Sequence, residues 1–190
     1  MVLLPYHSMG RIKRTTADLR KLADEHLKYE IDCLFGTALA MNAIRQESAT
    51  DFIGTAVRNA LLESFAIHAR TLLQFLYSES PNGDWVIAED FFDVPETWFQ
   101  GRPQKSFRLG ELTRRVAKEV AHLSYDRLLV RPEKKPWNIV HLAKEFAIVL
   151  AVFNQLVSSE RITQGLRDSI LQGIDLTSEI TLPREAGQST

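Results

Sequence analysis

The stretch from residue 51 to residue 77 constrains the fold most, because it is a long helical pattern without a proline. Apolar residues recur there at intervals of three and four, the spacing of one helix, and they cover most of the circumference. We therefore expect a long helix at the centre of the core. No stretch of useful length alternates apolar and polar residues as a half-buried strand does, so the sequence predicts an all-α protein.

Helical spacing also recurs in the segments before and after this stretch. Turn residues in "SESPNGDW" and "GRPQKS" bound an irregular acidic connection. The segments together predict an all-α four-to-five-helix bundle with a long irregular acidic connection between the second and third main helices. The domain organisation expected is an N-terminal lead-in at 1–14, a single helical bundle domain at 15–172 and a loosely held C-terminal tail at 173–190. The expected helices are 16–45 with an N-cap at Thr15 or Thr16, 51–77, short helices at 88–92 and 96–99, 106–125, 136–158 with Pro136 in its first turn, and 163–171.

Composition places the chain among soluble globular proteins. It has 190 residues, of which 45% are hydrophobic and 25% charged. Its longest apolar run, residues 146–153, is less than half of the roughly 20 residues that a membrane-spanning helix needs. Residues 1–14 have their apolar run before their charges, the reverse of a signal peptide. Cys33 is the only cysteine, so we expect a cytoplasmic protein with no disulfide and no contact with a membrane.

The net charge of −1 hides two segments of opposite charge. Residues 79–98 carry six acids and no lysine or arginine, whereas residues 102–135 carry ten bases against four acids. A local basic surface can bind phosphate groups even on a neutral protein. The two segments can equally neutralise each other within the fold or on a second copy, and the sequence leaves both interpretations open.

Several catalytic motifs are absent from the sequence. It contains no glycine-rich phosphate loop, no paired cysteines, no H-E-x-x-H and no G-x-S-x-G. Glu119 and His122 have the Glu-x-x-His spacing of di-metal helical bundles, but such sites need two of these motifs and the chain has one. We therefore expect no cofactor and no metal.

Arg115 and His122 form the strongest candidate for a catalytic pair. At about 100° per residue, seven residues return to nearly the same direction, so both side chains project from one helix face with Lys118 close by. This face lies about 100° from the apolar stripe of the same helix. A neutral imidazole can take a proton from a ribose 2′-hydroxyl while a guanidinium holds the adjacent phosphate. One such pair is too sparse for an active site, but a two-fold dimer would supply two.

The segment "RVAKEVAH", Arg115-x6-His122, resembles the Arg-x(4–6)-His motif of the HEPN superfamily of small helical bacterial proteins. The resemblance implies a metal-independent endoribonuclease of toxin or antiphage type, working as a homodimer on RNA and controlled by an antitoxin protein. In that hypothesis Arg115 is the phosphate clamp, His122 the base or acid, and Lys118, Tyr125 and Arg127 lie near the RNA. Val116 departs from the small polar residue that often follows the arginine. The alternative is a non-catalytic helical bundle that binds a protein or nucleic-acid partner.

The helix predicted at 51–77 also carries a narrow polar face. Two interpretations remain open: a solvated stripe, or a buried or interfacial network in which Glu63 and Arg70 are paired and face the Arg115–His122 pair. His68 lies about 140° from Glu63, and we expect it to be packed or hydrogen-bonded rather than catalytic. The residues of this face lie within about 40° of one direction, and they are Asn59, Glu63, Arg70, Gln74 and Tyr77.

Overall fold

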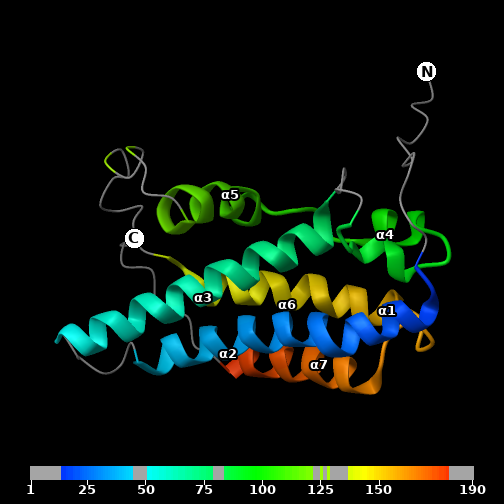
Figure 1. Cartoon of the computed structure of the whole chain (residues 1–190), viewed down its shortest axis with the longest axis horizontal. Coiled ribbons are helices and arrows are strands. Elements are labelled where there is room, and N and C mark those ends of the chain that lie inside the picture. The colour runs from blue at the N-terminus through cyan, green and yellow to red at the C-terminus, as the bar shows by residue number, and fades with distance from the viewer. Residues whose placement is uncertain are drawn as a thin grey trace, which may run out of the picture.

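The computed structural model describes residues 14–44, 51–78, 84–121, 125, 128 and 137–179, and every regular element in these ranges is helical (Figure 1). The predicted all-α bundle is therefore confirmed. The π-helical turns η1 and η3 and the 3₁₀ helix η2 accompany the α-helices. In chain order the elements are α1 (Thr16–Leu22), η1 (Ala23–Leu27), α2 (Lys28–Ile44), α3 (Phe52–Tyr77), η2 (Ala88–Phe91), α4 (Glu96–Gly101), α5 (Phe107–Arg115), η3 (Val116–Ala121), α6 (Ile139–Leu156) and α7 (Gln164–Glu179).

Side-chain caps fix the starts of the first two long helices. The Thr15 hydroxyl accepts a hydrogen bond from the Asp18 backbone N–H at 3.1 Å, and Asp18 accepts one from the Thr15 N–H at 3.2 Å. This reciprocal box satisfies two N–H groups that a helix start leaves without partners. Asp51 caps α3 in the same way by accepting from the Gly54 N–H at 2.7 Å. Both predicted helix starts are therefore confirmed.

The core lies between α2, α3, α6 and α7. Helix α6 has the length and composition of a membrane-spanning helix, but half of it is buried inside the bundle, so we interpret it as a core helix of the bundle. Ile148, which is 61% exposed, lies on its outward side. The fully buried large side chains of these helices include Ile31, Leu34, Phe65, Leu72, Leu76, Phe146, Leu150 and Phe153.

The acidic connection between α3 and α5 folds back onto the bundle. The rings of Phe91, Phe92 and Trp98 each meet Phe153 edge to face, with centroids 5.6 to 6.0 Å apart. The Trp98 indole N–H also donates to the Leu76 carbonyl at 3.0 Å. Edge-to-face contacts and a satisfied indole N–H are typical of a well-packed aromatic core. The two short helices predicted in this connection, at 88–92 and 96–99, are present as η2 and α4.

The C-terminal helix is longer than predicted. It was expected to end at residue 171, with a loose tail from 173, but α7 continues to Glu179. Gly173 is buried, and a Cβ atom added to it would overlap the ring of Phe35 on α2. Thr177, one turn later, is only 4% exposed. Gly173 therefore allows a close approach of α7 to α2.

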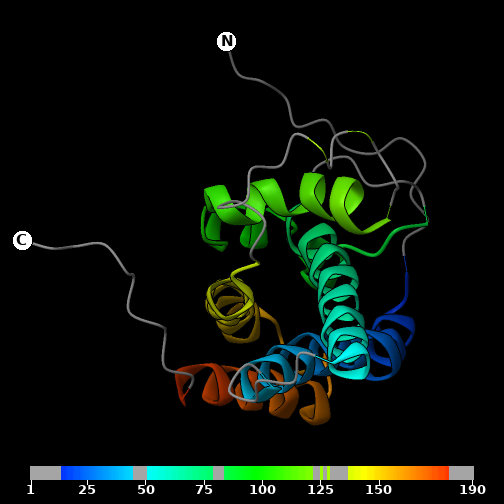
Figure 2. The same cartoon turned by 90° about the vertical axis from the view of Figure 1, so that its left-hand side faces the viewer.

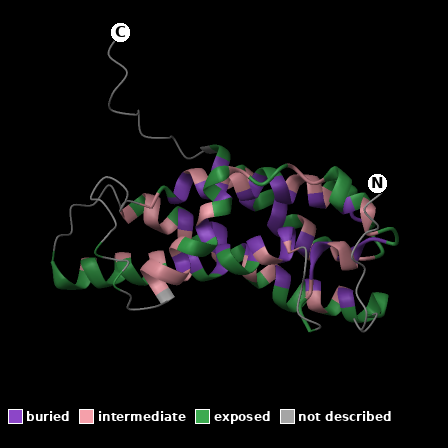
Figure 3. Ribbon diagram, turned by 90° about the horizontal axis from the view of Figure 1, so that it is seen from above, coloured by how far each residue is buried: buried purple, intermediate pink, exposed green. Residues whose placement is uncertain are grey.

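The prediction that all of α3 lies in the core is wrong for its first half. None of the residues from Phe52 to Ser64 is buried, whereas nine of those from Phe65 to Tyr77 are. In Figure 1 the N-terminal end of α3 projects beyond the other helices, and Figure 3 shows this end in the colour of exposed residues. Burial in the core of one chain therefore does not explain the apolar residues in the first half of α3.

Candidate functional site

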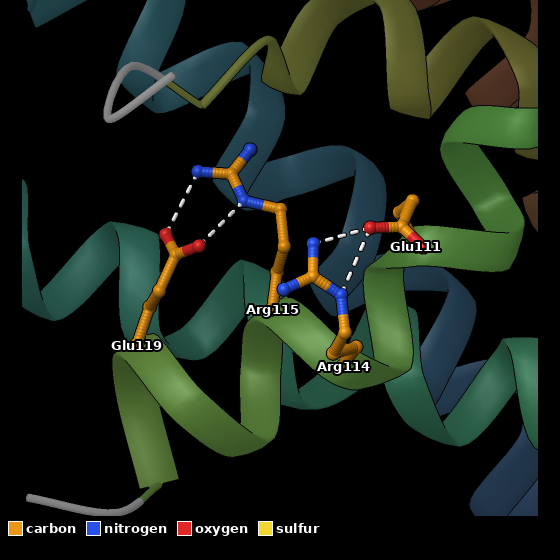
Figure 4. A network of polar contacts seen from close by, with 4 residues as sticks. All are labelled: Glu111, Arg114, Arg115 and Glu119. Carbon is orange, nitrogen blue, oxygen red and sulfur yellow. Dashed lines mark hydrogen bonds and ion pairs between the residues drawn. The ribbon is translucent and has the colours of Figure 1, made fainter. Parts of the chain in front are cut away.

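Arg115, the arginine of the predicted catalytic pair, is the last residue of α5. Its Nε and Nη2 atoms donate to the two carboxylate oxygens of Glu119 at 2.9 and 2.8 Å (Figure 4). Its guanidinium carbon lies 4.3 Å from the centre of the Trp137 ring. The side chains of Arg115 and Glu119 are only 21% and 17% exposed. The forked pairing and the indole together fix the plane of the guanidinium.

Glu119 changes the chemistry available to Arg115. A carboxylate that accepts both of these hydrogen bonds neutralises the guanidinium, so a phosphate would have to displace the carboxylate or share the arginine with it. The same contact turns Glu119 toward Arg115 and away from the role of metal ligand that the Glu-x-x-His spacing raised. Among the residues that the structure describes, no three histidine, cysteine or acidic side chains are grouped to hold a metal ion.

The helix changes type between Arg115 and the predicted histidine. Residues Val116–Ala121 form the π-helical turn η3, in which hydrogen bonds reach one residue further than in an α-helix. The step of about 100° used to place Arg115 and His122 on one face therefore does not apply to this segment. His122 and Arg127 lie outside the described residues. Lys118 is half-buried in η3, and Tyr125 is 90% exposed.

The seam between α5 and α6 contains a histidine that sequence reasoning missed. Trp137, His141 and Glu145 follow one another at four-residue intervals. Trp137 contacts α5, and Glu145 contacts both α5 and its N-cap residue. Trp137 stacks on Arg115, while Glu145 accepts from Arg108 at 3.3 Å and from the hydroxyl of the cap Ser106. The Nδ1 atom of His141, between them, is buried without a hydrogen-bond partner, which is rare in native proteins. A single histidine in an apolar helix gave no signal in the sequence.

The predicted polar face of α3 does not form one network. Glu63 and Arg70 are both exposed, and in the part of the chain that the structure describes no hydrogen bond or ion pair joins them. Tyr77 is instead buried, and its hydroxyl donates to the Pro103 carbonyl at 3.0 Å. Burial raises the pKa of the Tyr77 phenol above its ordinary value. The C-terminal end of this face, at Tyr77, is therefore structural, and the part that carries Glu63 and Arg70 is solvated.

His68 has the structural role expected of it. Its Nδ1 atom lies 2.8 Å from a carboxylate oxygen of Glu30 on α2. The Tyr29 ring meets the imidazole edge to face, with centroids 5.5 Å apart. The side chains of His68 and Glu30 are 11% and 24% exposed. The histidine therefore ties α3 to α2.

A row of exposed apolar side chains follows α3 on the side away from the bundle. Ile53, Ala60 and Ile67 are spaced seven residues apart, which places them within about 40° of one direction. Phe65 and Leu72 point to the opposite side, into the core. Figure 2 shows α3 obliquely, between α5 above and α2 below. We define the outer face of α3 as Phe52, Ile53, Ala56, Val57, Ala60 and Ile67, all of which are exposed.

The sequence contained the signal for this face. The apolar residues of the first half of α3 centre on a direction nearly opposite to that of Phe65, Ala69 and Leu72 in the second half. Taken together, the two directions look like the pattern of one helix that is apolar nearly all round. A change of apolar direction within one helix indicates instead that its two halves bury different sides.

Comparisons with family models, with curated proteins and with solved structures each find no match to this chain.

Proposed function

We propose that this chain is a non-catalytic helical bundle that binds a protein partner, and that it does so through the outer face of α3. The exposure of large apolar side chains there carries the proposal: Phe52 is 88% exposed, Ile53 71%, Ile67 55% and Val57 43%. Soluble proteins rarely leave such a contiguous row open to water, and where they do it marks an interaction site. An amphipathic helix face is also a common way for proteins to recognise one another.

The chemistry of the face favours a protein over a nucleic acid. Nucleic-acid binding depends on lysine and arginine side chains that neutralise phosphates. Between Phe52 and Ile67 the outward side carries only one charge, the acid Glu63, and Arg70 follows one turn later. An apolar strip with one charge of each sign matches the composition of protein interfaces.

Photo-crosslinking tests the proposal. A photoreactive amino acid placed at Val57 should form crosslinks to a protein in the producing cell. The same residue placed at Ile148, an exposed apolar position on α6 (61% exposed), should form few or none. Identification of the crosslinked peptides by mass spectrometry would show whether one defined partner, this chain included, occupies the face. Equal crosslinking from the two positions would refute the proposal.

A metal-independent endoribonuclease is the second candidate function. The observation in its favour is that a half-buried, oriented arginine stands at the start of a π-helical turn, since such turns are frequent at functional sites. In this proposal Arg115 leaves Glu119 to clamp a phosphate and His122 moves the proton. Lys118, Tyr125 and Arg127 contact the RNA, and an antitoxin protein in the cytoplasm restrains the enzyme.

Incubation of the purified protein with RNA in the presence of EDTA tests this second candidate. Cleavage should fall at least about a hundredfold in His122→Ala and Arg115→Ala. Glu119→Gln removes the competing charge with little change of shape, so it should retain or increase cleavage. RNA that stays intact with the wild-type protein, or cleavage unchanged in His122→Ala, would exclude the catalytic assignment.

A further inference from the structure

Two opposite charges lie along one edge of the outer face of α3. Glu63 and Arg70 are two helical turns apart and differ by about 20° in direction. Both are exposed, and neither side chain has a hydrogen bond or ion pair within the part of the chain that is described. A partner that pairs with both charges must present an arginine or lysine opposite Glu63 and an acid opposite Arg70. These two partner residues must have the same two-turn spacing.

We propose that the partner on this face is a second copy of the chain, with the two α3 helices antiparallel. This proposal rests on the function proposed above. A two-fold axis makes contacts reciprocal, so a copy that places Arg70 opposite Glu63 also places Glu63 opposite Arg70. Two ion pairs then form on either side of the axis. Ile67, 55% exposed in the single chain, lies next to the axis in both copies. It therefore packs against Ile67 of the other copy.

This register also brings part of the projecting end of α3 against the second copy. Opposed positions add up to 133, as Glu63 and Arg70 do, so Ala56 lies opposite Tyr77, the last residue of the helix. Of the outer face, Ala56, Val57 and Ala60 therefore lie along the second α3, whereas Phe52 and Ile53 lie past its last residue.

Charge reversal in solution tests the register. Glu63→Arg leaves two arginines at the paired positions, and Arg70→Glu leaves two acids, so each variant should repel its own copy. Mixed together, the two variants present opposite charges at both pairs. In sedimentation velocity the wild-type protein should be a dimer, and each variant alone should dimerise at least about tenfold more weakly. The equimolar mixture should regain the wild-type affinity.

Ile67→Glu should also produce a monomer, and Ile148→Glu is its control because Ile148 has similar exposure on another helix. Circular dichroism should show the same helix content in all variants, since these side chains are exposed in the single chain. A mixture that remains monomeric would overturn the proposed register. If the wild-type protein is a monomer and position 57 crosslinks to a different protein, the proposal that the partner is a second copy is overturned. The proposed function then still stands. A monomer without crosslinks would overturn both.

Discussion

At the scale of single residues, two arginine–glutamate pairs lie next to each other (Figure 4), and they differ in their burial. Arg115 and Glu119 are 21% and 17% exposed, whereas Arg114 and Glu111 are 56% and 36% exposed. Removal of Glu119 takes away the carboxylate that accepts two hydrogen bonds from a partly buried guanidinium, so Glu119→Ala should lower the free energy of unfolding by about 1–3 kcal/mol. Glu111→Ala should lower it by about 0.5 kcal/mol or less. Urea unfolding measures both, and equal losses would show that burial of the Arg115 pair has no energetic effect.

Tyr77 gives the protein a sensitivity to alkaline pH. Burial raises the pKa of its phenol above the ordinary value in the folded state. As pH rises past the ordinary pKa of about 10, the unfolded chain loses the proton while the folded one keeps it, so stability falls until the folded pKa is reached. Tyr77→Phe should lose stability less steeply in this window. Urea unfolding at several alkaline pH values tests this, and parallel curves for the two proteins would contradict it.

The residue scale also shows where sequence reasoning stops. The pattern of residues 114–122 singled out Arg115, and the four-residue spacing to Glu119 was readable from the sequence. The stacking of Trp137 on Arg115 was not, because it joins residues 22 positions apart whose relative placement no local pattern determines. The unpartnered Nδ1 of His141 depends in the same way on how α5 lies over α6. Contacts between distant segments decide what a side chain can do, and one sequence does not contain them.

At the scale of elements, replacing either of two helical glycines by alanine should have opposite effects on stability. A Cβ atom at Gly36 in α2 meets nothing within 4 Å, whereas one at Gly173 in α7 overlaps the ring of Phe35. Gly36→Ala should therefore stabilise the protein by about 0.5–1 kcal/mol through helix propensity. Gly173→Ala should destabilise it by about 1–3 kcal/mol because Phe35, 3% exposed, has little room to move. Thermal unfolding distinguishes the two, and stabilisation by both would refute the close approach of α7 to α2.

Helix positions were predictable where local chemistry sets them. Thr15 and Asp51 are side-chain caps, and both helix starts follow from them. The end of α7 was not predictable, because Gly173 lies in the helix for a reason of packing rather than termination. Periodicity likewise found α3 but did not tell which half of it is covered. An apolar residue fits equally well against its own core or against another protein.

At the scale of the whole molecule, the exposed first half of α3 links fold to proposed function. The composition of 45% hydrophobic residues includes side chains that one copy of the chain does not bury. The sequence therefore predicted a bundle correctly and overstated its core. Four of the exposed large apolar side chains, Phe52, Ile53, Val57 and Ile67, are grouped on one side of one helix, and this grouping is the reason for proposing an interaction surface there.

A second copy on this surface would make stability depend on protein concentration. Because only folded chains can pair, dimerisation stabilises the folded state by mass action, and the melting temperature of the wild-type protein should rise with concentration. Val57 is 43% exposed in the single chain, so Val57→Ser should leave the melting temperature at low concentration nearly unchanged and flatten its rise. Differential scanning calorimetry over a hundredfold range of concentration measures both effects. A wild-type melting temperature that is constant over this range would mean that the outer face of α3 does not bind its own copy.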